Sequence, residues 1–305
     1  MVHEKSIAIV IASYLRPQRA RSVVNQLTKL ITPADSIIVV WQKKNYDHLL
    51  QKHPSLKTTT LKHANLPAAR NTGIINSSSD IVLFLDDDVE IDNLLLEKHR
   101  CAYETPDTGG IAGFVQDPIF PISASAPSYF DITTGECVQN FSLPEKQLTI
   151  SMMGANMSFK RSAIEMIQGF DTNYKGNALW EEIDAAFRLR NAGFRIMYCP
   201  EAKVKHLREN QGGCRSSGKR IYLYHQFANT AYFACRYMPL KHCFSWLKFW
   251  KNRLEFLTRK EQCGHYKTHI FSGICGAIAG ILRYSSVSFV LKSKRINSEK
   301  IFPSQ

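Results

Sequence analysis

The sequence predicts an α/β fold, with a mostly parallel central sheet flanked by helices and followed by a helical C-terminal region. Short runs that are almost wholly apolar are typical of strands buried on both faces of a sheet. Segments with helical periodicity separate these runs, and such alternation favours parallel pairing. From about residue 220, aromatic and basic residues interleave at helical spacing. We therefore expect one domain over residues 1–218 and a basic, aromatic-rich helical region over 219–305.

The expected elements follow one another along the chain. A buried strand covers 6–11, and Pro17 suits the first turn of the helix after it. In sheets of this kind, ligands bind beyond the carboxyl ends of the strands. Residues 117–150 are rich in Pro, Ser and Thr, and a loop this long is usually a lid or a binding loop. Further strands are expected at 36–41, 80–85, 110–116, 154–159 and 193–199, and further helices at 66–79, 92–103 and 180–192.

The positive charge of the chain is concentrated in its last third. The 305 residues have a formal net charge of +13. Residues 201–305 hold 19 Lys and Arg against 5 Asp and Glu, whereas residues 1–200 hold 20 against 21. A basic region suits nucleic acid, an anionic membrane surface or a phosphate-bearing ligand. The near-neutral first two-thirds argue against a general nucleic-acid coat, so we expect no nucleic acid partner.

The cysteines and two apolar segments indicate a cytoplasmic protein. The eight cysteines form no Cys-x-x-Cys pair and no zinc-like spacing, which favours reduced thiols. The N-terminal apolar run does not resemble a signal peptide, and the stretch 270–282 is too short to span a bilayer comfortably. Residues 242–260 have spacings that permit an amphipathic helix on an anionic membrane face. The alternative for them is an ordinary helix packed on the first domain.

Three consecutive aspartates follow the predicted strand at 80–85, in the stretch IVLFLDDDV. Each close pair of carboxylates repels by about 3 kcal/mol at roughly 5 Å and an effective dielectric of about 20. Asp86, Asp87 and Asp88 would offer oxygen ligands to a hard cation such as Mg²⁺ or Mn²⁺, which would make the cluster favourable. The alternative is that one aspartate caps the next helix and the others are solvated.

His206 lies just after the last predicted strand, in KVKHLRENQGGCRSSGKR. A lone histidine is more often structural than a ligand, but Mn²⁺ accepts a neutral imidazole. Gly212 and Gly213 would let backbone N–H groups approach an anion, and Arg215 would neutralise it. A flexible basic loop beside a metal site suits a diphosphate.

Two further segments carry polar groups on predicted helices. In WEEIDAAFRLRNAGF, the acidic residues Glu181, Glu182 and Asp184 fall in a first helical turn, where the helix dipole alone explains them. The functional alternative is that one of them faces a cleft as a general base. NLPAARNTG places Arg70 and Asn71 within a short helix, which alone is weak evidence.

Together and in this order, these segments resemble the family 2 glycosyltransferases, which are inverting enzymes of the GT-A fold. The likeness covers roughly residues 5–215. SIAIVIASYLRP is similar to the first strand and turn of that family, and FLDDDV matches its D-x-D motif. NLPAARNTG resembles its G-x-x-x-A-R-N-x-G segment, with Asn65 in place of Gly. GANMSFKRSAIEMIQGFD and WEEIDAAFRLRNAGF resemble the segments around its acceptor site.

The resemblance implies a role for each matching residue. Asp88 and His206 would bind a divalent cation, Mn²⁺ or Mg²⁺, with Asp86 beside them. Glu182 would be the catalytic base, with Glu181 and Asp184 shaping the acceptor pocket. Acceptor contacts would come from Trp180 and Asn156. Donor contacts would come from Ser13, Tyr14, Arg16, Trp41, Gln42, Arg70, Asn71, Asp86, Asp87 and Arg215.

Two departures from the family pattern put details in doubt. Trp41 and Gln42 occupy the place where an Asp often reads the uracil base; Trp41 could stack on the base and Gln42 could hydrogen-bond it. Glu182 stands where Asp is common, and its carboxylate lies about one C–C bond further out. Glu181 could therefore take the role of the base instead.

The implied reaction is transfer of a sugar from a nucleoside-diphosphate sugar to a hydroxyl group of a glycan or a lipid-linked acceptor, in cell-surface polysaccharide biosynthesis. One alternative is a nucleotidyltransferase, which should carry a Gly-rich phosphate loop after the first strand. The turn here, ASYLRPQRAR, lacks glycine. Another alternative is a related binding or scaffold protein that has lost activity, although the retained carboxylates and His206 argue against decay.

Overall fold

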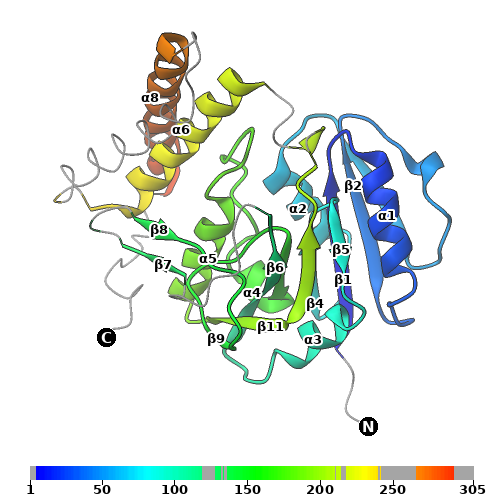
Figure 1. Ribbon diagram of the computed structural model, residues 1–305. Helices are drawn as coiled ribbons and strands as arrows, with labels where there is room; N and C mark the ends of the chain where they lie inside the picture. Colours follow the sequence, from blue (N-terminus) through cyan, green and yellow to red (C-terminus); the bar gives the residue numbers. More distant parts are fainter. Residues whose placement is uncertain are drawn as a thin grey trace.

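The computed structural model describes residues 5–118, 128–131, 133, 136–209, 211–213, 218–239, 241 and 266–291. A nine-stranded sheet lies at the centre, with strand order β3-β2-β1-β4-β10-β6-β11-β5 and β9 paired to β11. Helices cover the sheet, and α6 and α8 project from one end of the molecule (Figure 1). The strands are β1 (Ile7–Ser13), β2 (Ser36–Gln42), β3 (Leu56–Leu61), β4 (Ile81–Leu85), β5 (Val89–Ile91), β6 (Thr108–Gln116), β9 (Gln147–Leu148), β10 (Asn156–Lys160) and β11 (Arg195–His206).

The helices account for most of the remaining described chain. They are α1 (Pro17–Leu27), the short 3-10 helix η1 (Asp47–Leu49), α2 (Leu66–Ile75), α3 (Leu95–Cys101), α4 (Arg161–Met166), α5 (Glu181–Asn191), α6 (Lys219–Tyr237) and α8 (Tyr266–Leu291). Two short strands, β7 (Tyr129–Phe130) and β8 (Cys137–Val138), form a separate small sheet. The predicted α/β class with a mostly parallel sheet is confirmed. The predicted lid, 117–150, contains β7, β8 and β9 among its described residues.

The first half of the chain follows right-handed crossover topology. β1 pairs in parallel with both β2 and β4, and β2 pairs in parallel with β3. The connection from β1 to β2 runs in one direction across the sheet, and the connection from β3 to β4 runs in the other. Right-handed crossovers place α1 and α2 on opposite faces, and in such sheets ligands bind at the carboxyl ends of the strands where the direction changes, here β1 and β4. We call this edge of the sheet the crevice.

Local signals explain where the first helices begin. Pro17 occupies the first position of α1, where its missing N–H costs nothing. α2 is capped by Asn65, whose side chain accepts a hydrogen bond from the N–H of Ala68. Ala20, Val23 and other apolar residues of α1 are buried against β1 and β2, which are themselves almost wholly buried.

β11 carries the chain back to the crevice. It runs parallel to β6, with a register shift between Cys199 and Lys203, and then pairs antiparallel with β5. In the second pairing His206 lies opposite Val89, directly after the three aspartates. The register of this ladder therefore delivers His206 to the acidic end of β4.

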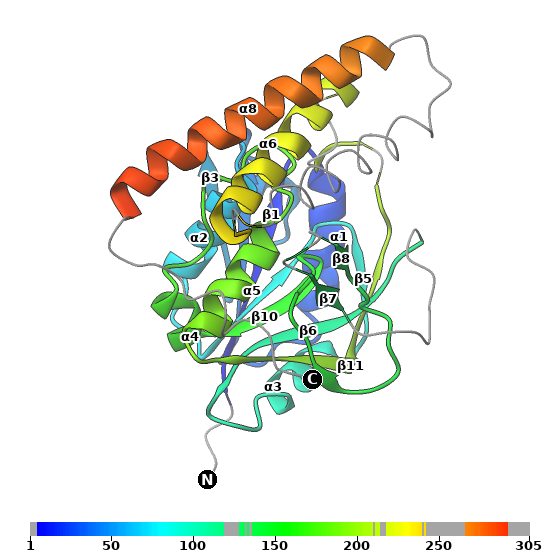
Figure 2. The same cartoon turned by 90° about the vertical axis from the view of Figure 1, so that its left-hand side faces the viewer.

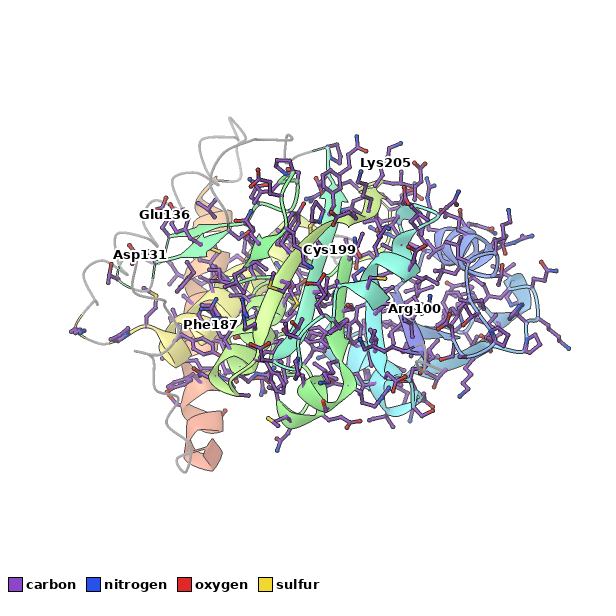
Figure 3. All side chains as sticks on the ribbon, turned by 90° about the horizontal axis from the view of Figure 1, so that it is seen from below. Arg100, Asp131, Glu136, Phe187, Cys199 and Lys205 are labelled. Carbon is purple, nitrogen blue, oxygen red and sulfur yellow. The ribbon has the colours of Figure 1, made fainter. Side chains whose placement is uncertain are left out.

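The described C-terminal helices pack onto the rest of the molecule through aromatic side chains. Phe187 of α5 lies 5.6 Å from Phe233 and 5.2 Å from Tyr237 of α6, measured between ring centroids. Figure 3 shows Phe187 beside the yellow ribbon of α6. α8 runs along the outer side of α6 (Figure 2). Within the described residues, no helix is long and apolar enough to cross a membrane. The predicted amphipathic segment 242–260 lies outside the described residues.

Candidate active site

Three predicted metal ligands lie together at the crevice. Asp86 and Asp88 follow β4, and His206 is the last residue of β11. One ligand atom from each lies within 4.8 Å of the other two. His206 Nε2 is 3.4 Å from Asp88 Oδ1 and 3.8 Å from Asp86 Oδ2. The sheet thus joins two segments that are far apart in the sequence into one group.

This donor set fits a divalent cation. Two carboxylates and an imidazole are ligands that Mn²⁺ accepts. Asp88 is buried, and its Oδ1 has no hydrogen-bond partner within the described part of the chain. His206 Nδ1 lies 2.9 Å from Asp117 Oδ2. A proton on Nδ1 donates to this carboxylate, which leaves Nε2 free to face Asp86 and Asp88 as a ligand.

Attraction between opposite charges lowers the pKa of Asp88 and raises the pKa of His206. Burial raises the pKa of Asp88, but the close approach of the His206 ring and the charge of Arg16 outweigh it and hold that pKa at about 2. Burial lowers the pKa of His206, but hydrogen bonds and attraction from Asp88, Asp86 and Asp117 raise it above its usual value. A cation on Nε2 would take the place of the imidazolium proton, so metal binding would release a proton.

Arg16 and Asp87 form the back of the acidic cluster. Asp87 is buried, and its Oδ2 accepts a hydrogen bond of 2.6 Å from Ser13 Oγ. Arg16 Nη1 lies 3.2 Å from Asp87 Oδ1 and 2.9 Å from Asp88 Oδ2. Burial raises the pKa of Asp87 to about 7, against the attraction of Arg16 and the hydrogen bond from Ser13. The guanidinium therefore offsets much of the repulsion between the aspartates.

Arg16 also binds the segment after β11. Its guanidinium donates hydrogen bonds to the main-chain carbonyls of Glu209, Gln211 and Gly212, at 2.7, 2.6 and 3.3 Å. One side chain of the β1–α1 turn thus links the aspartates to the segment that the sequence predicted as a phosphate-binding loop.

Two glycines of this segment allow its close approach to the β1–α1 turn. Gly212 and Gly213 have positive φ angles, and a Cβ at either would collide with the side chain of Arg16. The N–H of Gly213 donates to the carbonyl of Tyr14, at 2.8 Å. Arg215, which the sequence assigned to the donor, lies outside the described residues.

Arg70 of α2 joins the metal group to the acidic first turn of α5. Its side chain is buried, and Nη1 is ion-paired with Glu181. The same nitrogen lies 3.6 Å from Glu182 Oε1, and Nη2 lies 3.9 Å from Asp86 Oδ1. The ring of Phe170 lies 5.4 Å from the guanidinium carbon. The guanidinium was predicted to contact the donor, and it lies between the two groups of carboxylates.

The two adjacent glutamates differ in exposure. Glu181 is fully buried, whereas the side chain of Glu182 is 25% exposed. Burial raises the pKa of Glu182, and the charge of Arg70 opposes this shift. Gly154 leaves space for both groups, because a Cβ there would lie 2.7 Å from Glu182 Oε1 and 2.0 Å from Arg70 Nη2. Of the two glutamates, Glu182 is the one that a hydroxyl group in the crevice can reach.

Asp184 does not join this group. Its fully buried carboxylate lies 2.7 Å from Arg188 Nε and 3.1 Å from Arg236 Nη1, and it accepts a hydrogen bond of 2.7 Å from the Tyr237 hydroxyl. These partners tie α5 to α6. In this arrangement Asp184 joins α5 to α6, and its predicted part in shaping the acceptor pocket stays a prediction.

Trp180 is likewise engaged by α6. The side chain is almost fully buried, Nε1 donates to Thr230 Oγ1 at 2.8 Å, and the ring stacks on Phe233 at 4.7 Å. Trp180 has a positive φ of 79°, which for a bulky residue signals strain held by its surroundings. Its ring and N–H face α6, and its predicted contact with the acceptor stays a prediction.

Two asparagines predicted at the site serve the framework. Asn156 is fully buried; its amide donates to main-chain carbonyls of β6 and β11, and its Oδ1 lies 2.8 Å from His99 Nε2. Asn71 exchanges two hydrogen bonds with the main chain of Phe170. Backbone groups engage both amides in this structure, and the contacts of Asn156 with the acceptor and of Asn71 with the donor stay predictions.

Trp41 and Gln42, which stand where an Asp often reads the base, form hydrogen bonds within the protein. Trp41 is fully buried, and its Nε1 donates to Asp47 Oδ1 at 2.7 Å. Gln42 is buried and accepts a hydrogen bond from the N–H of Asn65. The indole ring of Trp41 is enclosed by the protein here, and its stacking on a base stays a prediction.

Two contributors to the site were not singled out from the sequence. Asp117 follows the carboxyl end of β6 and orients His206, while also accepting from Arg208 Nε. The same rule about strand ends that drew attention to the three aspartates would have found it. Gly154 precedes β10, and no sequence signal marks its closeness to Arg70 and Glu182.

Comparisons with known proteins agree with this geometry. The family model described as glycosyl transferase family 2 matches residues 8–163. The structure of GalNAc-T7 with UDP, GalNAc and Mn²⁺ superposes with a TM-score of 0.63 at 12% identity, covering 97% of this chain and 59% of that one. The chain thus spans about 59% of the length of that structure. No curated protein matches the chain in sequence.

Two smaller proteins are similar over most of their length. Mannosyltransferase PcManGT from Pyrobaculum calidifontis, in complex with GDP-Man and Mn²⁺, has a TM-score of 0.53 at 12% identity and coverage of 96% of this chain and 89% of that one. S. aureus TarS 1–349, in complex with UDP-GlcNAc, has a TM-score of 0.56 at 13% identity and coverage of 94% and 92%.

The fold is that of the GT-A glycosyltransferases, which is the class of protein that the sheet topology and the comparisons define. The family match covers half of the chain and includes β1, the three aspartates and β10. The chain belongs to glycosyl transferase family 2.

Proposed function

We propose that this protein is a metal-dependent, inverting glycosyltransferase that moves a sugar from a nucleoside-diphosphate sugar to a hydroxyl group. One observation carries the proposal: a metal-binding group and a partly exposed carboxylate face the same crevice, with Arg70 between them. Arg70 lies 3.9 Å from Asp86 and 3.6 Å from Glu182. A reaction in which a diphosphate leaves while a hydroxyl loses its proton needs these two kinds of group.

The metal group supports the donor side of the proposal. Asp86, Asp88 and His206 would hold Mn²⁺ or Mg²⁺, and such a cation would offset the charge that develops on the diphosphate leaving group. Asp117 fixes the ring of His206, and Arg16 places the glycine-containing segment beside the aspartates. Structures of similar fold hold UDP, GDP-Man and UDP-GlcNAc, which supports a nucleoside-diphosphate donor without fixing its base.

Glu182 supports the acceptor side. Its carboxylate would accept the proton of the acceptor hydroxyl as the acceptor oxygen bonds to the anomeric carbon and the bond to the diphosphate oxygen breaks. Attack opposite the leaving group inverts the anomeric centre. General base catalysis typically contributes about 10²- to 10⁴-fold. Arg70 would hold Glu182 in place, and its positive charge would favour the ionised carboxylate that can accept a proton.

The acceptor and its setting are proposed more broadly. A glycan or lipid-linked acceptor in cell-surface polysaccharide synthesis would fit a cytoplasmic enzyme held at the inner face of a membrane. The support is the concentration of positive charge in residues 201–305, which suits anionic lipid headgroups.

A donor screen tests the proposal. Binding and hydrolysis of UDP-, GDP- and dTDP-sugars are measured with Mn²⁺, with Mg²⁺ and with chelator, and a CMP-sugar, which lacks a diphosphate, serves as the control. We expect one diphosphate donor to bind and turn over with metal and to lose both responses with chelator. A response to no nucleotide sugar would contradict the proposal and favour a binding or scaffold protein of the same fold.

A further inference from the structure

Helix α8 exposes a row of large apolar side chains on the face turned away from α6. α8 forms the outermost layer at this end of the molecule, and α6 separates it from α5 (Figure 2). At about 100° per residue, the five exposed positions fall within roughly 100° of the helix circumference. They are Phe271, Ile274, Ile278, Ile281 and Leu282, with exposed fractions between 42% and 64%.

The opposite face of α8 is built from small residues. A Cβ on Gly276 would lie 2.2 Å from the carbonyl oxygen of Tyr224, and a Cβ on Gly280 would lie 2.2 Å from that of Ala228. The backbones of α6 and α8 therefore approach closely, and the large side chains of α8 point away from the protein. A helix in water normally does the reverse and turns its large apolar residues to the core. Small residues at the helix contact and large ones outside are typical of helices in contact with lipid.

The charged residues that flank this apolar row in the sequence are all positive. The sequence has no Asp or Glu from residue 262 to residue 298. Lys267 precedes the row by one helical turn, and Lys292, Lys294 and Arg295 follow the helix. At the start of α6, Arg220 is exposed, and its main-chain carbonyl accepts a hydrogen bond from Ser272 of α8.

We propose that the outward face of α8 docks on a lipid bilayer that contains anionic lipids. From residue 271 to residue 282 the row extends about 17 Å, at 1.5 Å per residue, which is shorter than the roughly 30 Å hydrocarbon core. The helix therefore lies along the membrane surface with its apolar row among the acyl chains. Two other occupants of this face would be a second copy of the chain and residues 242–260. Both carry positive charge and would be repelled by the charge near the row, whereas anionic lipid would be attracted.

Docking in this way also bears on the acceptor. α8 packs on α6, and α6 begins a few residues along the chain after the segment that binds Arg16, so α6 stands between α8 and the crevice. On the basis of the proposed function, this arrangement would hold the crevice near the membrane surface, where a lipid-linked acceptor would be found. The docking itself does not depend on the reaction and can be measured without any donor.

Vesicle sedimentation of the full chain tests the docking. Vesicles of phosphatidylcholine alone are compared with vesicles that also contain phosphatidylglycerol. We expect binding to the anionic vesicles and a loss of about tenfold or more in affinity for the double variant Ile274→Asp with Ile278→Asp, because charged side chains resist burial among acyl chains. The control is Ile75→Asp with Met166→Asp, at positions that are 81% and 61% exposed on α2 and α4, and it should bind like the wild type.

Three results would overturn the proposal: no binding of the wild type to anionic vesicles, equal binding to neutral vesicles, or unchanged binding of the double variant. Light scattering tests whether a second copy of the chain covers this face instead. If the wild type is a dimer that binds no vesicles, and the double variant is a monomer, the face is a dimer interface. Circular dichroism establishes that each variant is folded. The milder Ile274→Ser with Ile278→Ser variant should show an intermediate loss and serves if the aspartate variant does not fold.

Discussion

The carboxylates at the end of β4 and those in the first turn of α5 are similar in the sequence and differ in their surroundings. In the first run Arg16 binds Asp87, and in the second Arg70 binds Glu181. Each run leaves one side chain partly exposed toward the crevice: Asp86 at 33% and Glu182 at 25%. Burial against an arginine thus distinguishes Asp87 and Glu181 from Asp86 and Glu182, which lie beside Arg70 but keep part of their surface exposed.

Removal of a carboxylate from the metal group should have the largest effect. We expect Asp88→Ala to lower turnover by about 10³-fold or more, since a bound cation supplies several kcal/mol of charge stabilisation. Donor binding that depends on Mn²⁺ should be lost with it, as measured by calorimetry with and without metal. Glu90→Ala, two residues away in a surface ion pair with Lys205, should leave both properties unchanged. Metal-dependent donor binding that persisted in Asp88→Ala would remove this residue from the proposed site.

The second comparison is between the two adjacent glutamates. Glu182→Gln should lower turnover by about 10²- to 10⁴-fold while donor affinity stays at the wild-type value. Glu181→Gln should instead lower the free energy of unfolding by about 3 kcal/mol, because it leaves Arg70 buried with less compensation. Kinetics and urea unfolding of both variants measure this contrast. Near-normal turnover in Glu182→Gln would show that the base is another group.

The third carboxylate of α5 should behave as a structural residue. Asp184→Asn should lower the free energy of unfolding by about 3 kcal/mol, since Arg188 and Arg236 lose their common partner. Turnover per folded molecule should change by only a few-fold, at a temperature where the variant is folded. Asp107→Asn, in a half-exposed pair with Arg195, is the control and should leave the free energy of unfolding close to the wild-type value. A stable Asp184→Asn variant that had lost activity would reverse the assignment.

The smallest effect is the pH dependence. The pKa of Glu182 is raised by burial, so the carboxyl is protonated, and cannot act as a base, below that raised value. We expect kcat/KM to fall about tenfold per pH unit below this pKa and to level off above it. A pH profile of the wild type measures this fall of kcat/KM at acidic pH. The residual activity of Glu182→Gln should not show the fall. If it did, the group that titrates would not be Glu182.

Periodicity was sufficient to predict the fold in outline. The strands at β1, β2 and β4 were expected within one or two residues of their bounds, because they are buried and nearly all apolar. The helix α5 was expected equally closely, because its apolar residues recur at helical spacing. β11 was expected over 193–199 but extends to His206, since its second half alternates buried and exposed residues. β3 was not expected, since LKTTTL is a partly exposed edge strand with a weak apolar signal. β10 was expected as a strand, but its antiparallel pairing with β4 and β6 depends on the path of the chain between them.

The site was predicted unevenly for a related reason. Asp86, Asp88 and His206 follow strands that end at one edge of the sheet, so their meeting could be expected from strand order. The roles of Asp184 and Asn156 could not, because a buried polar side chain is defined by its partners, and those are remote in the sequence. Arg236, for example, lies more than fifty residues from Asp184.

The short ladder between β5 and β11 has a consequence for how this chain tolerates changes in length. Buried Val204 and His206 alternate with exposed Lys203 and Lys205, so one inserted or deleted residue between the bulge and His206 would turn the imidazole to solvent and a lysine to the aspartates. A change of length beyond Gly213, after the contacts with Arg16 and Tyr14, would leave this register unchanged. Related chains should therefore keep the spacing before His206 most strictly.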